Sequence, residues 1–404
     1  MIKRNMRLIV SNQFFTTLAD SMFDIAILWY VYQLTNSAFF AATVMAITTL
    51  TNVLVAPVIG VFLDRKEPKT SMQIGYAFMF LIGIMLASGY FIQLDSLIFL
   101  IYVSIILQHV CMIFVGPAEN KLLPRIVGEN RIVKVNGYIT STSQTSKLIG
   151  QSISGFVIGL IGFIGVMLTH SFFYLLASIL LIFVINISLE QSVEEKKTRP
   201  SFLKELKSGL HVLKNNKPVF KMVLLATALN VTTIAGSLLV VLVTNQYGAT
   251  AIQFGLLNAS GAVIGIIMGL LASKIINLTR PFIIMTIDFI IAGLAFIGMG
   301  MTDNYYIGLL FFILMIGSGT IEGIMYSSIL IILVQDEFRG RVATITVALA
   351  SFLIPPLTML GGYMADVYQV SYLFLFAGAW MALWALVPIL DRDIRSINKL
   401  QGEG

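Results

Sequence analysis

Residues 139–155 read ITSTSQTSKLIGQSISG, and Lys147 in their middle is the only charged residue between Lys134 and Glu190. Such an uncharged run is long enough for two membrane crossings, because a helix needs about 20 apolar residues to span the hydrocarbon core. The whole chain has this character: its 404 residues are 57% hydrophobic and only 11% charged, with a mean hydropathy of +0.90. These values exceed what a soluble domain needs, so the sequence predicts a polytopic membrane protein.

Twelve segments are long and apolar enough to be predicted as transmembrane helices. They lie near residues 8–34, 39–63, 69–93, 97–121, 132–162, 165–189, 218–244, 252–275, 281–301, 304–334, 341–366 and 369–390. The basic start of the chain precedes a long apolar run without a small-residue cleavage pattern, so we expect it to be retained as the first helix. The expected fold class is an all-α membrane protein.

The positions of the basic residues indicate how the chain is oriented. With the N-terminus in the cytoplasm, 25 of the 26 Lys and Arg residues fall on inner segments and the outer loops hold none. Lys147 is the single exception. We therefore expect a multi-pass protein of the cell membrane with both termini cytoplasmic. The net charge of +6 then reports topology, and no nucleic-acid partner is expected.

Residues 190–217 are the longest polar stretch and divide the chain in half. Within them, SFLKELKSGLHVLKNN is predicted to form an amphipathic helix at the inner membrane surface. The expected domains are an N-terminal six-helix bundle at 1–189, this cytoplasmic linker at 190–217, and a C-terminal six-helix bundle with a short cytoplasmic tail at 218–404. An offset of about 210 residues aligns the first helix with the seventh and indicates internal duplication.

Two duplicated halves are expected to enclose a site at the bilayer midplane that is reached alternately from each side. Charged residues inside a membrane are costly and usually serve function or pair with one another. Asp20 and Asp24 lie one turn apart on the first helix, in a polar stripe with Gln13, Thr16 and Thr17. Two carboxylates this close do not both ionise easily, so one should hold a proton near neutral pH. We therefore interpret Asp20 and Asp24 as proton-coupling residues; alternatively, one of them simply pairs with Lys147.

Lys147 also lies on a polar stripe, since Thr140, Gln144, Lys147, Gln151 and Ser154 recur at helical spacing. It is about 20 Å from Lys134 along a helix, too far for its ammonium to reach the headgroup region. It must face a cavity or an acidic partner. Gln144, Lys147 and Gln151 are therefore expected to line a substrate cavity.

Other polar residues of the membrane segments have more than one interpretation. Gln108 and His109 lie at a similar depth and are also expected at the cavity, although a lone histidine can simply bond to a neighbouring helix. Asn230 aligns with Asp20 in the second half and is expected at the cavity as well.

Three further carboxylates lie in the predicted helices. Glu119 is near the inner end of the fourth helix, where we expect it to pair with Arg125 or Arg131. Glu322 has no such partner in sequence and is the second predicted proton-coupling site. Asp288 ranks lower.

Four stretches resemble a known family. GVFLDRKEPK (60–69) resembles the loop motif that follows the second helix in the major facilitator superfamily. LLPRIVGENRIVKVNG (122–137), SFLKELKSGLHVLKNNKP (201–218) and QDEFRGRV (335–342) look like stretches of its drug:proton antiporter branch, which includes macrolide-efflux proteins. The resemblance covers nearly the whole chain and implies two pseudo-symmetric six-helix bundles. It also implies that helices 1, 2, 4 and 5 line the cavity of the first half, which makes Asp20 or Asp24 the partner of Lys147.

The loop motif carries a prediction of its own. Asp64, Arg65 and Lys69 would bridge the two halves when the cytoplasmic side is shut, and Gly60 would permit close helix packing. Alternatively, the basic residues of this loop only set the topology.

The sequence contains no Ser/His/Asp ordering, no metal-ligand spacing and no phosphate-binding glycine loop. We therefore expect no enzymatic activity and no cofactor, with a proton gradient as the energy source. The predicted function is export of an amphipathic small molecule by proton antiport with alternating access, performed by a monomer in the lipid bilayer. Alternatives of the same fold are a lipid or lysolipid flippase and an exporter of a siderophore-type anionic metabolite. A channel or a structural membrane protein is disfavoured by the duplicated halves.

Overall fold

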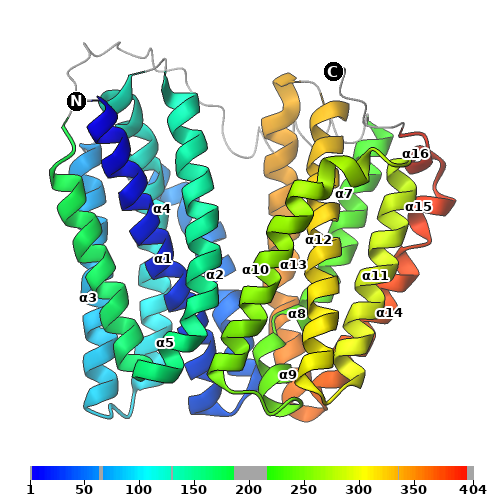
Figure 1. Ribbon diagram of the computed structural model, residues 1–404, viewed down its shortest axis with the longest axis horizontal. Helices are drawn as coiled ribbons and strands as arrows, with labels where there is room; N and C mark the ends of the chain where they lie inside the picture. The colour runs from blue at the N-terminus through cyan, green and yellow to red at the C-terminus, as the bar shows by residue number, and fades with distance from the viewer. Residues whose placement is uncertain (1, 63–66, 129–130, 186–215, 335, 398–404) are drawn as a thin grey trace. The chain divides into compact units, whose positions relative to one another are not determined.

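The computed structural model describes residues 2–62, 67–128, 131–185, 216–334 and 336–397 of the chain. All the regular elements in these ranges are helices (Figure 1). They form two compact units, each of which is described on its own. Unit 1 comprises Met1–Asn36, Ile47–Glu194 and Thr250–Ala259, and unit 2 comprises Ser37–Ala46, Glu195–Ala249 and Ser260–Gly404.

Unit 1 is built from long apolar helices. They are α1 (Ile2–Thr35), most of α2 (Ala38–Phe62), α3 (Pro68–Phe91), α4 (Leu97–Val127), α5 (Ile132–Ile182) and the first turns of α10 (Ala251–Ile276). α5 is two consecutive helices that meet at Gly162, whose φ of 66° and ψ of −168° break the helical path. Glycine adopts this positive φ without a Cβ clash. The turn lies where the sequence predicts an outer loop.

Small residues bring the helices of unit 1 into close contact. A Cβ at Gly155 would lie 2.4 Å from the Cα of Gly255, and one at Gly150 would lie 2.8 Å from the Cβ of Ser21. In a bilayer, helices associate through such close packing because lipid is as apolar as the side chains. The glycines of α5 therefore join α5 to both α1 and α10.

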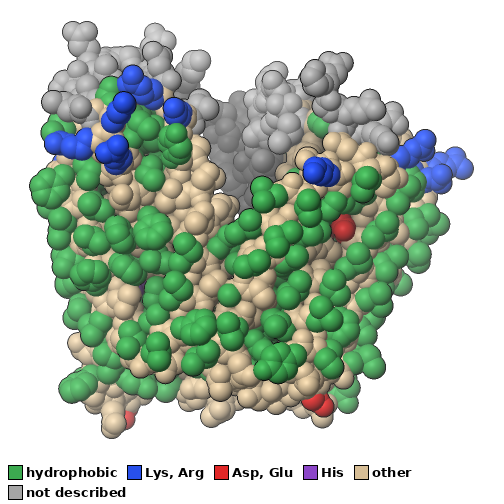
Figure 2. All heavy atoms as spheres, viewed as in Figure 1, with side chains coloured by type: hydrophobic (Ala, Val, Ile, Leu, Met, Phe, Trp, Pro, Cys, Tyr) green, Lys and Arg blue, Asp and Glu red, His purple; other side chains and the backbone are tan. Residues whose placement is uncertain are grey.

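Polar bonds hold together the ends of α1, α4 and α5 at one end of unit 1. Asn5 donates to the carbonyls of Ile126 (3.0 Å) and Ile185 (2.8 Å). Lys69 donates to the carbonyls of Ile182 (2.9 Å) and Val184 (2.7 Å). The carbonyls of Ile126 and Ile182 belong to the last turns of α4 and α5, where they lack helical partners, and Val184 and Ile185 directly follow α5. On the face shown in Figure 2, Lys and Arg side chains gather at this end.

Unit 2 contains the remaining helices. α7 (Lys217–Leu229), η3 (Asn230–Thr232), α8 (Thr233–Gly236) and α9 (Leu239–Asn245) form one interrupted span, followed by the rest of α10, α11 (Pro281–Met301), α12 (Tyr305–Leu333), α13 (Asp336–Val367), α14 (Val370–Trp384), α15 (Val387–Leu390) and α16 (Arg392–Arg395). α11 packs against α12 and α14. The indole of Trp380 donates to the carbonyl of Ala228 at 2.8 Å, which joins α14 to α7.

The first turns of α2 belong to unit 2, where Asp366 at the end of α13 caps them. Its carboxylate accepts hydrogen bonds from the hydroxyl of Ser37 (2.5 Å) and from the backbone N–H groups of Ala38 (2.5 Å) and Phe39 (3.1 Å). A Cβ at Gly362 would lie 2.7 Å from the Cα of Phe39, so glycine is required for this approach. Residues more than 300 positions apart in the chain therefore share one helix cap.

The described helices agree with the predicted all-α membrane fold. Ten described segments are long and apolar enough to cross a membrane. One of the ten, Lys134–Ile182, includes both halves of α5, and α13 is a further helix of 32 residues. These helices lie where the sequence predicts twelve crossings.

The predicted domain boundaries remain a prediction. Residues 186–215, which hold nearly all of the predicted linker and its amphipathic helix, lie outside the described residues. Asn216 is described: its side chain accepts from the N–H of Val219 and caps α7.

Candidate functional site

Asp20 is held in unit 1 by two neighbouring helices. Its Oδ1 accepts hydrogen bonds from the hydroxyl of Tyr174 on α5 (2.6 Å) and from Nε2 of Gln108 on α4 (3.2 Å). The side chain of Asp20 is half-buried, and Gln108 and Tyr174 are buried. Asp20 therefore faces the interior of unit 1, and both of its hydrogen bonds stabilise an ionised carboxylate.

Asp24, one turn further along α1, has a different environment. It is exposed, as is Lys147 on α5, and the two side chains interact electrostatically. They form no direct ion pair among the described contacts. The sequence left open whether Asp20 or Asp24 is the acidic partner of Lys147, and in the structure Lys147 interacts electrostatically with Asp24.

The polar stripe of α5 is accessible at one end and buried at the other. Thr140, Gln144 and Lys147 are exposed, Gln151 is half-buried, and Ser154 is buried. The hydroxyl of Ser154 donates to the carbonyl of Met22 at 3.3 Å. The stripe therefore presents its amide and ammonium groups at an accessible surface of unit 1 and uses its last hydroxyl for packing against α1.

His109 lies close to this site. Its Nδ1 is 2.9 Å from the carbonyl oxygen of Ile105 in the same helix, and the ring interacts electrostatically with Asp20. The structure thus brings together Asp20, Asp24, Gln108, His109 and Lys147 from three helices of unit 1. Their roles in proton coupling and substrate binding stay predictions.

Three buried residues of this region were missed by the sequence analysis. They are Tyr76 on α3 and His170 and Tyr174 on α5. The ring of Tyr174 lies 4.9 Å from that of His170 and 5.7 Å from that of Tyr76, between centroids. One signal could have revealed two of them, because His170 and Tyr174 are four residues apart and share a face of an otherwise uncharged helix.

The expected pairing of Glu119 with Arg125 or Arg131 is wrong. Oε1 of Glu119 is buried and has no hydrogen-bond partner among the described residues, and its carboxylate interacts electrostatically with Tyr76. The reason is helical geometry. Glu119 is three turns from Gln108 and shares its inward face, whereas Arg125 lies six residues further on and is exposed on another face.

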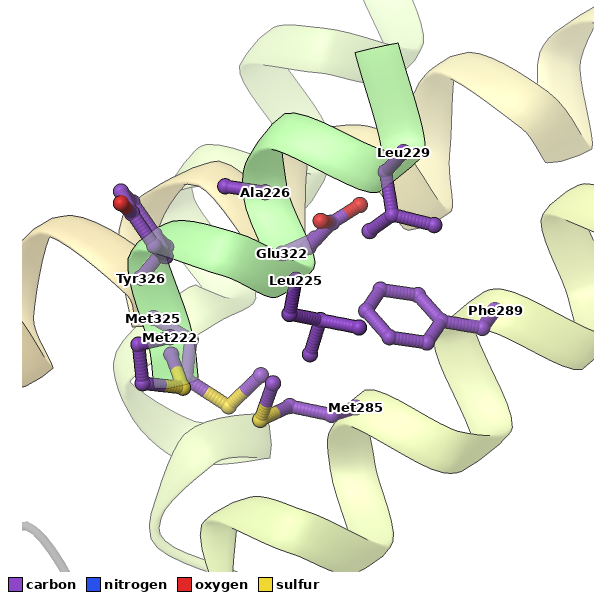
Figure 3. A pocket seen from close by; sticks show the side chains of 9 residues that line it. All are labelled: Met222, Leu225, Ala226, Leu229, Met285, Phe289, Glu322, Met325 and Tyr326. Atoms are coloured by element: carbon purple, nitrogen blue, oxygen red, sulfur yellow. The ribbon is translucent and has the colours of Figure 1, made fainter. Parts of the chain in front are cut away.

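The other predicted proton site, Glu322, lies in unit 2 beside a small cavity (Figure 3). The cavity has a volume of only about 10 Å³. It is lined by Met222, Leu225, Ala226, Leu229, Met285, Phe289, Glu322, Met325 and Tyr326. Figure 3 shows the three methionines gathered on one side of Leu225 and Glu322 on the other. Glu322 interacts electrostatically with Asp288, which is only 7% exposed and whose Oδ2 has no partner among the described residues. Asp288, ranked lower from sequence, therefore belongs with Glu322.

The remaining predicted residues are placed as follows. Asn230 begins η3 at the interruption of the seventh span, is half-buried, and is not part of the lining in Figure 3. Gly60 lies in α2. Asp64 and Arg65 lie outside the described residues. Lys69 binds the carbonyl end of α5, and its part in a gate stays a prediction.

Among the described residues, no three His, Cys, Asp or Glu side chains are grouped so that they could hold a metal ion. The two sites are therefore small sets of carboxylates with hydroxyl, amide, imidazole or ammonium neighbours, placed inside membrane-spanning helices. Such groups can bind and release protons and can orient a polar part of a ligand. This arrangement, on interrupted and glycine-packed helices, is typical of secondary transporters.

Residues 9–357 match the family described as Major Facilitator Superfamily, and the chain belongs to this family. It is 22% identical to macrolide efflux protein A of Streptococcus pyogenes, over 96% of each chain. It is 24% identical to a protein of the same name from Enterococcus faecalis, over 74% of this chain and 93% of that one. Its fold resembles the crystal structure of a bacterial homologue of the iron transporter ferroportin, with a TM-score of 0.75, 16% identity and 96% and 98% of the two chains covered.

The family assignment fixes the class of the protein. It is a multi-pass membrane transporter and not an enzyme, because members of this family move substrates across membranes. The resemblance identified in the sequence, to macrolide-efflux proteins of this superfamily, is confirmed.

Proposed function

We propose that the protein exports an amphipathic small molecule from the cell in exchange for protons. The observation that carries the proposal is the different surroundings of two carboxylates one turn apart on α1. Asp20 is bound by Tyr174 and Gln108, and Asp24 is exposed and interacts electrostatically with Lys147. An antiporter needs a proton-binding group and a substrate-binding group close enough for each to influence the other.

In the proposed cycle, a proton from outside neutralises Asp20, and substrate binds from the cytoplasm when that proton has left. Protonation removes the negative charge that the hydrogen bonds from Tyr174 and Gln108 stabilise. It also removes the repulsion between Asp20 and Asp24, so Asp24 then pairs more fully with Lys147. Proton binding at Asp20 thereby changes the charge presented by Asp24 and Lys147 to a substrate.

The substrate class is supported by the relatives named macrolide efflux protein A and by the mixture of polar and apolar side chains around the site. Gln144 and Lys147 are exposed on one side of α5, and the half-buried apolar Leu148 is next to Lys147 in the chain. A ligand with an apolar body and a few polar groups fits such a surface. Because Lys147 is exposed, an anionic metabolite is the second candidate.

The proposed orientation places both chain termini in the cytoplasm of the cell that holds the protein in its plasma membrane. The basic residues at the end of unit 1 where α1 begins support it, since Lys and Arg concentrate on the cytoplasmic side of membrane proteins. We further propose that the two halves act by alternating access and that a monomer suffices.

Transport by the purified protein in liposomes with an imposed pH gradient tests the proposal. The substrates are a macrolide antibiotic, a lipophilic fluorescent dye, a lysolipid and an anionic siderophore. We expect gradient-driven movement of the macrolide or the dye, and its loss in Asp20→Asn and Asp24→Asn. Asp95→Asn, an exposed carboxylate between α3 and α4, is the matched control.

Several results would contradict this proposal. Movement of the lysolipid alone would favour a flippase, and movement of the siderophore alone would favour an anion exporter. Full pH-driven transport in both helix α1 variants would remove Asp20 and Asp24 from the proton path.

A further inference from the structure

Unit 1 contains buried polar side chains behind Asp20 that the proposed exchange does not use. We call them the buried relay cluster; they are Asn12, Tyr76, Glu119, His170 and Tyr174. Asn12 is 2% exposed, Tyr76 3%, His170 0% and Tyr174 2%, and Oε1 of Glu119 is buried. Polar groups are costly inside a membrane protein and tend to be retained for function. Five of them in one interior therefore call for a role.

The cluster begins at Asp20. The hydroxyl of Tyr174 donates to Oδ1 of Asp20 at 2.6 Å, a distance typical of a strong O–H···O⁻ bond. The side chain of Tyr174 is buried in the interior of unit 1, whereas those of Asp24 and Lys147 are exposed. A proton on Asp20 therefore has a neighbour on the side away from the proposed substrate surface.

Tyr76 extends the cluster beyond Tyr174. The two rings are 5.7 Å apart between centroids, and both residues interact electrostatically with Asp20. The hydroxyl of Tyr76 donates to Oδ1 of Asn12 at 2.7 Å, and Nδ2 of Asn12 donates to the carbonyl of Ala177 at 2.7 Å. Asn12 thus fixes the Tyr76 hydroxyl in the interior between α1, α3 and α5.

Glu119 is the end of the cluster. It interacts electrostatically with Tyr76, and its Oε1 has no hydrogen-bond partner among the described residues. Along α4 it lies 11 residues beyond Gln108, the partner of Asp20, which corresponds to about 16 Å. That displacement runs toward the end of unit 1 where Asn5 joins α1 to α4 and where the basic residues gather.

His170 is the last member of the cluster and packs against Tyr174. Its ring packs between Phe23 and Tyr174, at centroid distances of 5.0 and 4.9 Å, and neither ring nitrogen has a partner among the described residues. A Cβ at Gly83 of α3 would lie 3.0 Å from its Nδ1, so α3 closes that side.

The titratable groups that face the cluster come from each of the four helices packed around it. Besides its own members Tyr76, Glu119, His170 and Tyr174, these are Asp20 on α1, which binds Tyr174, Cys111 on α4, which interacts with Tyr174, and His109 on α4, which interacts with Asp20. On the other side of Asp20, Asp24 on α1 interacts with Asp20 and with Lys147 on α5, and both Asp24 and Lys147 are exposed.

We propose that Glu119 is a second proton-binding residue, which receives the proton from Asp20 through the hydroxyls of Tyr174 and Tyr76 and releases it toward the cytoplasm. This inference rests on the proposed proton exchange. It adds that protons and substrate use separate routes through unit 1, so a proton can leave while substrate occupies the surface formed by Asp24 and Lys147.

The transfer conserves protons and charge. Once Asp20 is protonated, its O–H donates to the Tyr174 oxygen, and the Tyr174 hydroxyl, which donates to Asp20 in the structure, turns toward Tyr76. The Tyr76 hydroxyl likewise breaks its hydrogen bond to Asn12 and turns toward Glu119. Asp20 then gives its proton to Tyr174, Tyr174 releases its own to Tyr76, and Tyr76 releases its own to Glu119. At each tyrosine oxygen one O–H bond forms and one breaks, so both tyrosines end neutral. Asp20 loses one proton and Glu119 gains it. A bridging water can carry the proton where two oxygens are not in direct contact.

Infrared difference spectroscopy of the full-length protein tests the relay without any substrate. A rapid change from about pH 8 to about pH 5 protonates those carboxylates whose pKa lies between these two values, and each carboxyl group so formed gives a C=O band. We expect one component to vanish in Glu119→Gln and to shift in Glu119→Asp, which identifies the band. In Tyr76→Phe, Tyr174→Phe and Asp20→Asn, that band should rise about 100-fold more slowly, the effect of losing a positioned proton donor.

The control is Tyr90→Phe, which removes a hydroxyl from the same helix as Tyr76 but outside the cluster. A Glu119 band that rises at the wild-type rate in both tyrosine variants would overturn the relay. So would a spectrum in which Glu119→Gln removes no band. If one tyrosine variant does not fold, the other decides, because each change removes only one oxygen.

The relay and the proposed function fail in different ways. If only the relay proposal is wrong, the infrared results fail as described, but pH-driven transport and its dependence on Asp20 are still observed in liposomes. If the proposed function is wrong, the wild-type protein shows no pH-driven transport of any tested substrate, whatever the infrared bands show.

Discussion

Asp366 caps a helix that lies more than 300 residues away in sequence, and its removal should loosen the start of α2. The substitution Asp366→Ala deletes all three hydrogen bonds to Ser37, Ala38 and Phe39. Loss of an N-cap side chain typically lowers the free energy of unfolding by about 0.5–2 kcal/mol. Loss of a negative charge at a helix N-terminus adds about 0.3–1 kcal/mol. We therefore expect a loss of about 1–3 kcal/mol from these two effects together. Asp366→Asn keeps an acceptor oxygen and should lose less.

The matched control is Asn304→Ala. Asn304 also caps a helix, since its side chain accepts from the N–H groups of Tyr306 and Ile307 at the start of α12, but its partners are neighbours in sequence. Both alanine variants should lower the midpoint of thermal unfolding in detergent. Only Asp366→Ala should free α2 from α13, because only that cap joins distant segments.

Maleimide labelling of Ala41→Cys, in a Cys111→Ser background, measures this release because Ala41 is 0% exposed while the start of α2 stays packed. A loss of about 1–3 kcal/mol changes a two-state population by about 5- to 150-fold, so labelling should become faster by a factor of that order in Asp366→Ala. It should stay at its starting rate in Asn304→Ala. Equal labelling rates in the two variants, or an unchanged melting midpoint in Asp366→Ala, would refute the reasoning.

Three further predictions concern charge and packing. Lys147→Met should lower the midpoint of thermal unfolding, because it leaves Asp24 without the positive charge with which it interacts. Adding Asp24→Asn should recover the loss, and additive effects in the double-mutant cycle would contradict this. Gly155→Leu should destabilise unit 1 by about 1–3 kcal/mol or more through overpacking, because a Cβ at this position would already lie 2.4 Å from the backbone of α10. An unchanged midpoint of thermal unfolding would show that α5 and α10 do not pack in this way. Burial raises the pKa of Asp391, but hydrogen bonds from Lys221 (2.7 Å) and from backbone N–H groups outweigh it and hold that pKa below its usual value. Its stabilising contribution is therefore present above the unfolded pKa of about 3.9 and is lost as the pH falls through the lower folded value. The extra acid sensitivity should be smaller in Lys221→Met, because only the backbone hydrogen bonds to Asp391 remain. An identical pH profile for the variant and the wild type would exclude a stabilising Lys221–Asp391 pair.

Much of the fold could be predicted from the sequence because a membrane imposes simple rules. Every backbone group must be paired inside the hydrocarbon core, so long uncharged runs can only be helices. The turn at Gly162 and the start of α7 after Asn216 lie close to the predicted limits of the fifth, sixth and seventh spans. The helical spacing of polar residues also identified Asp20, Asp24 and Lys147, since stripes along a helix can be read without a partner helix.

The tertiary structure decided how those stripes meet. Sequence spacing could not tell which aspartate interacts with Lys147, because that depends on the rotation and depth of α1 against α5. Glu119 seemed to have arginine partners because they are near in sequence, yet the face of α4 on which it lies turns it toward Tyr76. Tyr76, His170 and Tyr174 looked like ordinary apolar-helix residues until α3 and α5 placed them behind Asp20. The physical reason is common to all of these cases: helix formation in a bilayer is determined by local composition, whereas contacts between helices depend on close packing of residues that are distant in the chain.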